Sequence, residues 1–426
     1  MAQRDLDVQR TYLTLTLFTT LAASFIWGIN TLFLLDAGLD NTQAFAVNAF
    51  FTVGQVLFEV PTGVVADTRG RRFSFLLGTA TLMLATLLYL VMWEVRAGLV
   101  GWAISSILLG LGFTFFSGAT EAWLVDALKA TGYKGTLERI FARAQIVTGV
   151  AMLTGSVLGG VVAQVAGLGV PYVLRAVLLG VTFLIAFRFM RDIGFTPARG
   201  ASVGAEIGAV LRGSVDGGLR NPPVRWLMLS APFTAGVGIF AFYALQPYLL
   251  QLYGDPTAYG IAGLAAAIVA AAQITGGLIV PRVRRLFRRR TDALLVAGVA
   301  TVVLLVVIGL SNQFLVVLAL IVAWALIFAI EGPLRQAYLN GIIPSEQRAT
   351  VLSFDNLMGS AGGVVFQPIL GRVADVNGYG ASYVVSGAIQ ALALPFIFLA
   401  RREKAVSDPI RPGDEESVLA TPPEAA

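Results

Sequence analysis

The sequence predicts an all-α polytopic membrane protein whose twelve transmembrane helices form two six-helix bundles. Hydrophobic residues make up 57% of the 426-residue chain and charged residues only 13%. This is more apolar surface than a soluble core of this size can bury. The apolar residues gather in about twelve runs of roughly 20 residues, the length that crosses a hydrocarbon core about 30 Å thick.

Each run is expected to be helical, because backbone amides in lipid must be hydrogen-bonded within their own segment. The first run follows a charged stretch, Met1 to Arg10, but it is too long for a signal peptide and lacks a clear cleavage site. It is therefore predicted to be a retained helix. In chain order the predicted helices are residues 11–35, 43–66, 73–94, 98–125, 140–166, 171–190, 225–252, 257–280, 292–311, 314–340, 350–374 and 381–400.

A long polar loop divides the six N-terminal helices from the six C-terminal ones. The predicted units are an N-terminal bundle over 1–190, an inter-bundle loop over 191–224, a C-terminal bundle over 225–400 and a tail over 401–426. The tail lacks an apolar period, so it is expected to be disordered.

Two segments of the first half recur in the second half at nearly the same spacing. Gly63-Val-Val-Ala aligns with Gly277-Leu-Ile-Val, and Ser156-Val-Leu-Gly aligns with Pro368-Ile-Leu-Gly, which indicates an internal duplication. Parallel repeats of this kind predict two facing bundles with a substrate site near the middle of the bilayer. Rocking of the bundles would expose that site to each side in turn.

Basic residues predict the orientation. Of the 30 Lys and Arg residues, all but Arg96, Arg175 and Arg372 fall on one side of this topology. Both termini are therefore expected in the cytoplasm of a bacterial-type cytoplasmic (inner) membrane. The cluster from Arg282 to Arg290 is interpreted as an internal loop touching anionic lipid rather than nucleic acid. The expected partners are a small-molecule substrate and lipid, and the protein is expected to be a monomer.

The loop after the second predicted helix carries Gly63, Asp67, Gly70, Arg71 and Arg72 in the pattern Gly-x-x-x-Asp-x-x-Gly-Arg-Arg. Gly63 would allow close helix packing, and Gly70 would allow a tight turn. Asp67 can face basic groups or a helix N-terminus. The pattern resembles the signature of the major facilitator superfamily. That resemblance implies a secondary transporter in which this loop latches the two halves together on the cytoplasmic side.

The fifth predicted helix carries Gly155-Ser-Val-Leu-Gly-Gly160, which resembles the antiporter-type motif Gly-x-x-x-Gly-Pro-x-x-Gly-Gly of drug exporters. Ala151 replaces its first glycine, and Ser156 replaces the proline expected to bend the helix. Ser106-Ile-Leu-Leu-Gly110 stands where drug:proton antiporters usually have Arg-x-x-Gln-Gly. The resemblance favours the drug:proton antiporter (multidrug and tetracycline-type efflux) branch, and the departures keep uptake of a small polar solute as the alternative.

Ionisable residues within the spans are costly in lipid and are functional candidates by default. The resemblance implies that helices 1, 4, 7 and 10 line the cavity, so Glu121 and Glu331 are expected to face one another across it. Either carboxylate could carry a proton or neutralise a cationic substrate. Alternatively, Glu331 could pair with Arg335 one turn later.

Two further acids have structural alternatives. Glu59 could serve in a proton step or in a structural pair. Asp126, near the cytoplasmic end of helix 4, is expected to pair with Arg71 or Arg72 as part of the latch rather than to enter the cavity.

Aromatic and amide side chains on the first and seventh helices complete the predicted pocket. Apolar rings with few polar anchors beside an acid suit lipophilic cations, although such stripes also occur as ordinary packing or interfacial belts. The expected cavity residues are Trp27, Asn30, Phe240, Tyr243 and Gln246.

These patterns predict proton-coupled efflux of amphipathic or cationic drugs, with proton-coupled uptake of a small polar solute as the alternative. The chain has no histidine and no cysteine, so a membrane enzyme would lack the usual nucleophile, base and metal ligands. No catalytic residue, metal or cofactor is expected. The sequence has no phosphate-cradling loop of the kind that would indicate transport driven by ATP. The expected energy source is therefore the proton gradient. A sensor is disfavoured because no signalling domain is present.

Overall fold

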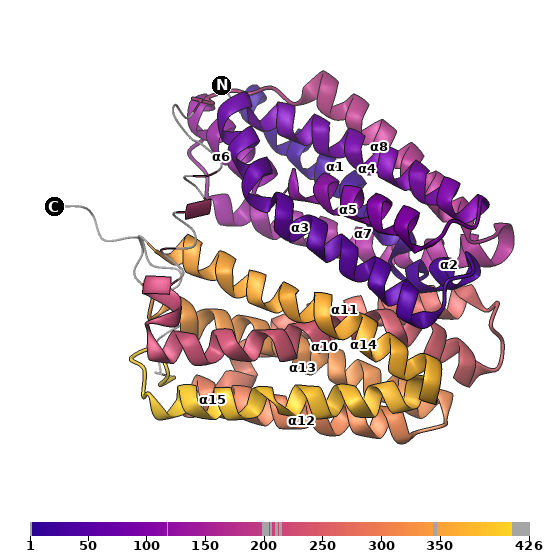
Figure 1. Cartoon of the computed structure of the whole chain (residues 1–426). Coiled ribbons are helices and arrows are strands. Elements are labelled where there is room, and N and C mark those ends of the chain that lie inside the picture. Colours follow the sequence, from indigo (N-terminus) through magenta and orange to yellow (C-terminus); the bar gives the residue numbers. More distant parts are fainter. Residues whose placement is uncertain are drawn as a thin grey trace.

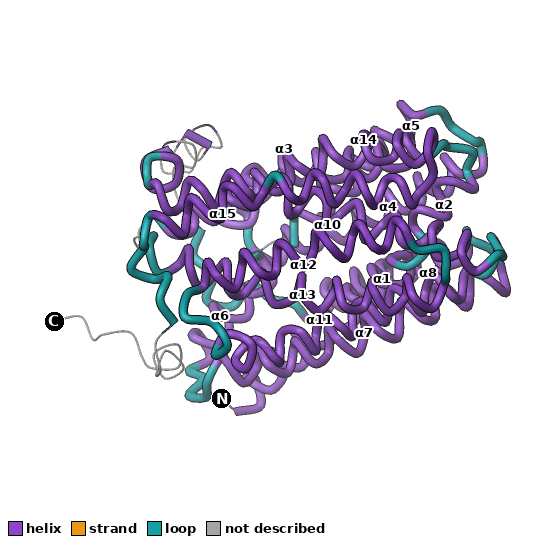
Figure 2. Tube along the Cα trace, turned by 90° about the horizontal axis from the view of Figure 1, so that it is seen from below, coloured by secondary structure: helices purple, strands orange, loops and turns teal. Residues whose placement is uncertain are grey.

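The computed structural model describes residues 2–116, 118–197, 215–343 and 347–410, together with residues 204, 207, 208 and 212. Within these residues every regular element is a helix, and the one β-type pairing is an isolated bridge between Arg289 and Pro409. The long helices run side by side, with the connecting loops gathered at the two ends (Figure 2). The N-terminal and C-terminal halves form separate groups of helices that lie against each other (Figure 1).

The N-terminal half runs from α1 to α8. Two of its spans are broken: α1 and α2 meet at an angle of 49°, and Gly118, with φ of +66°, separates α5 from α6. A left-handed residue cannot continue a right-handed helix, so the single helix predicted over 98–125 is instead two. The helices are α1 (Ala2–Trp27), α2 (Asn30–Asp36), α3 (Asn41–Arg69), α4 (Arg71–Glu94), α5 (Leu99–Thr114), α6 (Ala119–Thr131), α7 (Leu137–Ala166) and α8 (Gly169–Phe189).

The C-terminal half follows a short π-helix. Its last helical run crosses twice, because Gly378 takes a non-helical conformation with φ of +83° and turns the chain back. Counting that run as two spans and each broken helix as one, the described residues make twelve crossings, and the predicted fold class is confirmed. The elements are η1 (Val215–Leu219), α10 (Pro222–Tyr253), α11 (Tyr259–Arg284), α12 (Arg290–Leu310), α13 (Phe314–Asn340), α14 (Arg348–Ala391) and α15 (Ala393–Arg402).

The bundle has two distinct ends. We call the end with the start of α1 and the end of α15 the termini side, and the end with α2 and the α7–α8 turn the opposite side (Figure 1). The two halves meet where α3 packs on α14 and α7 packs on α11.

Hydrogen bonds between the halves cluster on the opposite side. Asp375 of α14 accepts from the backbone N–H groups of Asn41 and Thr42, at 2.9 and 2.8 Å. These N–H groups open α3 and have no partner within it, so the carboxylate of one half caps a helix of the other. Gln164 likewise accepts from the backbone N–H of Gly260 at 2.9 Å.

The α7–α11 contact depends on two glycines. A Cβ at Gly160 would lie 2.8 Å from the Cα of Gly263, and a Cβ at Gly263 would lie 2.5 Å from the carbonyl oxygen of Ser156. Any side chain at either position would force the helices apart, so small residues set this close approach. The opposite side is therefore closed by both packing and hydrogen bonds.

The structure differs from the sequence-based expectation at the C-terminus. Residues 401–402 continue α15, and residues 403–410 pack back on α12. Asp408 is 1% exposed, and its carboxylate accepts from the backbone N–H and the hydroxyl of Thr291 at 2.9 and 2.8 Å. The predicted disorder is wrong for residues 401–410, because a composition argument does not reveal that a carboxylate there can cap a helix N-terminus. Residues 411–426 lie outside the described residues.

We expect Gly263→Val to open the opposite side, because the added side chain collides with the backbone of α7. Since the chain has no cysteine, spin labels can be placed at Val165→Cys and Tyr253→Cys, two exposed positions on the opposite side. The distance between these labels should lengthen. Gly277→Val on the same helix is the matched control, because a Cβ there finds nothing within 4 Å. Equal distances in both variants would contradict this account of the closure.

Candidate functional site

A cavity of about 470 Å³ lies within the N-terminal half and reaches the C-terminal half at Tyr243 of α10. This volume is in the range of small-molecule sites. About half of its lining carries hydroxyl, amide or charged groups, and the rest is aromatic or aliphatic. The polar part includes Thr16, Thr20, Ser24, Asn30, Asn48, Tyr89 and Thr120, and the apolar part includes Trp27, Phe51, Leu82, Phe113 and Leu179.

Exposure changes along the cavity. It follows α1 from Thr16 to Trp27, a rise of about 16 Å at 1.5 Å per residue. Thr16 and Thr20 are partly exposed, whereas Asn30 and Tyr89, at the deep end, are buried. The cavity is thus accessible from the termini side and closed by the contacts of the opposite side.

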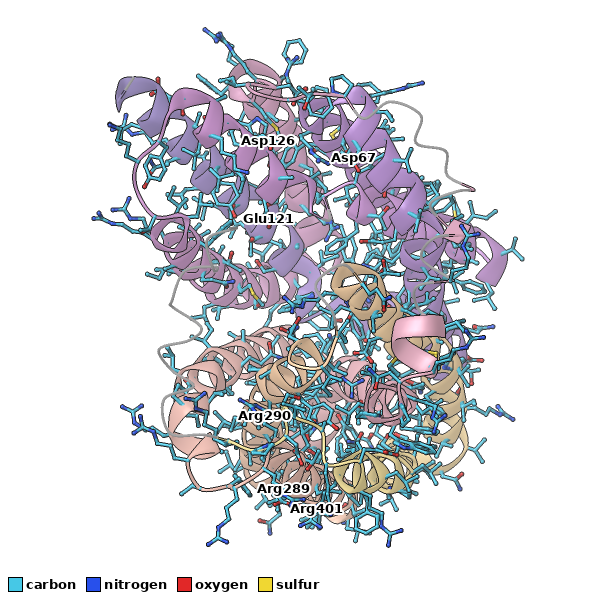
Figure 3. All side chains as sticks on the ribbon, turned by 90° about the vertical axis from the view of Figure 1, so that its left-hand side faces the viewer. Asp67, Glu121, Asp126, Arg289, Arg290 and Arg401 are labelled. Atoms are coloured by element: carbon cyan, nitrogen blue, oxygen red, sulfur yellow. The ribbon has the colours of Figure 1, made fainter. Side chains whose placement is uncertain are left out.

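Glu121 lies at the accessible end and is the one carboxylate that lines the cavity among the described residues. It is exposed and sits in the first turn of α6, where the positive end of the helix dipole favours an acid. Viewed from the termini side, it lies nearer the C-terminal half than Asp126 does (Figure 3). The structure therefore brings the Glu121 carboxylate into the cavity.

Glu331 does not face Glu121, in contrast to the expectation from the superfamily resemblance. It lies outside the lining of the cavity and beside Thr301 of α12. Its Oε1 is buried without a hydrogen-bond partner, as is the hydroxyl of Thr301. The physical reason is its direction: Glu331 points into its own half, between α13 and α12, rather than towards the other half.

Arg335 does not pair with Glu331 either. Its guanidinium binds Asp355 of α14 through two contacts of 2.5 and 3.2 Å, and it also donates to the carbonyl of Leu227 and the hydroxyl of Ser230. A bidentate arginine–carboxylate pair is stronger than a single contact one helical turn away. This pair ties α10, α13 and α14 together inside the C-terminal half.

The predicted pocket residues divide into two groups. Trp27, Asn30 and Tyr243 line the cavity. Phe240 instead is fully buried against Phe45 of α3, with ring centroids 4.6 Å apart. Gln246 accepts from the backbone N–H of Thr31 at 2.9 Å and donates to the carbonyl of Trp27 at 2.8 Å. The cavity prediction is therefore wrong for Phe240 and Gln246, because both are used to join the halves on the opposite side.

The sequence analysis missed Arg175 as a cavity residue. It was predicted to lie near the outer side with Arg96 and Arg372, but it lies within α8, 7% exposed, and lines the deep end of the cavity. The signal was available, since an arginine within an apolar span is costly and marks a candidate site.

The signature loop, residues 63–72, has the predicted turn, but its arginines do not have the predicted partner. Gly70, with φ of +108°, joins α3 to α4. Arg71 pairs with Asp67 at 2.5 Å, and the backbone N–H of Arg72 donates to Asp192 at 2.8 Å. Neither arginine pairs with Asp126 among the described residues, so that expectation is wrong in this state.

The remaining predicted residues have no contact with the cavity. Gly63 has no atom within 4 Å of where its Cβ would lie, so the close helix approach expected there is not made. Glu59 is exposed on α3 and lies outside the cavity lining.

Twelve crossings in two bundles, with a cavity in one bundle that reaches the other, are the arrangement of a membrane transporter. The sequence is matched by the model of the Major Facilitator Superfamily over residues 12–330 and 262–423, and the chain belongs to that superfamily.

One curated relative is an uncharacterized MFS-type transporter of Methanocaldococcus jannaschii, 25% identical over 182 residues. This match covers 42% of the present chain and 45% of the relative, so the chain aligns with less than half of that protein.

Solved transporter structures share the fold over most of the chain. The nucleoside transporter NupG has a TM-score of 0.76 at 10% identity, over 92% of this chain and 98% of that one. A bacterial homolog of the lysosomal transporter Spinster in an inward-facing conformation has a TM-score of 0.70 at 15% identity, over 96% and 99%. The D-xylose–proton symporter has a TM-score of 0.64 at 16% identity, over 92% and 96%.

We expect Asp355→Ala to destabilise the protein by about 3–5 kcal/mol, because it leaves the guanidinium of Arg335 buried without its partner. The side chains of this pair are 19% and 11% exposed. The matched control is Asp292→Ala, which breaks the pair with Arg401, whose side chains are 31% and 40% exposed. That loss should be about 0–1 kcal/mol. Thermal unfolding in detergent measures both, and equal losses would argue against a buried structural pair.

Proposed function

We propose that this protein is a proton-coupled secondary transporter that exports small amphipathic molecules by rocking alternating access. The observation that carries this proposal is Glu121, a carboxylate at the accessible end of a closed-ended cavity with mixed polar and aromatic walls. Binding of a proton or substrate there and its release after rocking would couple the two flows. Either event changes the charge of the cavity.

The hydrogen bonds between the two halves lie on the opposite side, and this placement supports alternating access. The halves are joined on the opposite side by Asp375 at the start of α3 and by Gln246 at the α1–α2 break. These hydrogen bonds are polar and can be exchanged for water, so their rupture during rocking costs little net free energy. The packing of α7 on α11 offers the surface along which the halves can tilt.

The distribution of charge supports a cytoplasmic opening of the cavity, the opening from which an exporter takes up its substrate. Nearly all arginines and lysines lie on the termini side, so we assign that side to the cytoplasm. The cavity in this state would then load substrate from the cytoplasm. The antiporter-like glycines of α7 also make close contacts: a Cβ at Gly155 would collide with Ser24, and one at Gly159 with the carbonyl of Phe25.

The second candidate function is proton-coupled uptake of a small polar solute. A polar network at the deep end favours it: Asn30 donates to Asn48 at 2.9 Å and accepts from the hydroxyl of Tyr172 at 3.0 Å. Such a buried network fixes the orientation of amide groups that can recognise a polar ligand.

The proposed mechanism also gives a role to the latch residues of the signature loop. In the present state Asp67 and Arg71 pair with each other, and the side chain of Asp67 is 49% exposed. We infer that these groups turn to the C-terminal half when the termini side closes.

We expect Glu121→Gln to abolish pH-gradient-driven movement of an amphipathic probe in proteoliposomes, because the amide can neither release a proton nor carry a charge. The probes are ethidium, a lipophilic cation, and dansylglycine, an amphipathic carboxylate, with protein-free liposomes as background. Glu94→Gln is the matched control, since Glu94 is an exposed acid at the end of α4 and outside the cavity.

Glu331→Gln is measured alongside, because Glu331 is the other acid that the sequence predicts for proton coupling. Loss of coupling in Glu331→Gln but not in Glu121→Gln would move the proton site to the C-terminal half. Absence of gradient-driven flux for both probes would sink the proposed mechanism.

A further inference from the structure

Arg175 is the one charged group at the deep end of the cavity. It comes from the middle of α8 and is 7% exposed, yet it contributes to the cavity wall. Its Nε donates to the hydroxyl of Thr86 at 3.1 Å. The structure gives the two terminal nitrogens of the guanidinium no hydrogen-bond partner among the described residues.

No carboxylate compensates this charge. The groups that face Arg175 are the phenols of Tyr89, Tyr172 and Tyr243. Two of these phenols donate their protons elsewhere: Tyr89 to Ser106 at 2.9 Å and Tyr172 to Asn30 at 3.0 Å. The three rings therefore surround the guanidinium with neutral groups and leave its charge unpaired within the described part of the chain.

Glu121 is too distant to serve as the partner. It lines the end of the cavity near Thr16, whereas Arg175 lies with Asn30 and Tyr89 at the other end. The separation along α1 is about 16 Å from the rise of the helix alone. One end of the cavity is thus acidic and solvent-exposed, and the other is basic and enclosed.

An unpaired guanidinium in a dry part of a membrane protein is costly, whereas an anion that supplies bidentate contacts removes that cost. We propose that Arg175 binds an anionic group of the transported molecule, so that the substrates are small amphipathic organic acids or zwitterions. Tyr89 and Tyr243 flank the anion, and Trp27, Leu82 and Leu179 receive the apolar part. This inference rests on the proposed transport function and gives its substrate class.

The division of roles follows from the geometry. The substrate anion neutralises Arg175 at the deep end, and Glu121 remains free of it for proton exchange at the accessible end. Recognition and coupling then use different residues. A lipophilic cation without an acid group would meet an uncompensated positive charge and bind weakly.

The test is equilibrium binding of dansylglycine and of its neutral amide to the full-length protein in detergent, followed by dansyl fluorescence. We expect the wild type to bind the carboxylate at least about tenfold more tightly than the amide, because a charge-assisted hydrogen bond exceeds a neutral one by that margin. Arg175→Gln should remove this preference by weakening only the carboxylate. Arg175→Lys should retain part of it. Arg372→Gln, an exposed arginine on α14, should change neither affinity.

Equal binding of the two probes by the wild type overturns the inference, and it does so even where Arg175→Gln fails to fold. A preference that survives in folded Arg175→Gln overturns it as well. If the wild type prefers the carboxylate over the amide through Arg175 but shows no gradient-driven flux, the anion site is supported and the proposed transport mechanism is contradicted. Failure of the anion site is thus distinguishable from failure of the transport mechanism.

Discussion

The close approach of α7 to α11 at Gly160 and Gly263 is the constraint on which the rest of this structure depends. Two helices from different halves can approach this closely only where neither carries a side chain. The contact brings the halves together on the opposite side, where Asp375 and Gln246 then find their partners in the other half. With that side closed, the cavity has a single accessible end. The same constraint explains why Phe240 and Gln246 serve the closure rather than the cavity.

The charged side chains within the helices are of two kinds, those that are paired with each other and those that are not. Arg335 and Asp355 satisfy each other and join three helices, so their charge serves stability within one half. Arg175 and Glu121 lie at opposite ends of one cavity, and neither has a partner of opposite charge within the described part of the chain. For the buried Arg175 this is costly unless a ligand supplies the missing charge. The contrast separates structural from functional charge by geometry alone. Under the proposed function, recognition and proton coupling would both lie in the N-terminal half, and Tyr243 is the contribution of the C-terminal half to the cavity wall.

Local patterns were sufficient for much of this protein. The twelve apolar runs predicted the crossings, and the glycine of the signature loop predicted the turn between α3 and α4. Glu121 was predicted for the cavity because it is an acid on one of the helices that the superfamily resemblance implies line it. The same expectation failed for Glu331, however, because its place on a cavity-lining helix does not fix the direction in which a side chain leaves that helix. A shift of one residue rotates that direction by about 100°.

The sequence by itself determined the membrane-spanning helices, their division into two halves and the superfamily, because these follow from hydropathy and from short motifs along the chain. The tertiary structure alone decided which charges are paired. Arg335 found Asp355 rather than Glu331, and the guanidinium of Arg72 found the carbonyl of Phe187 rather than Asp126, because partners distant in sequence meet only when helices pack. It also decided that Arg175 lies in the cavity. Position along a helix gives depth in the membrane, whereas only packing determines which face of a helix borders protein, lipid or the cavity.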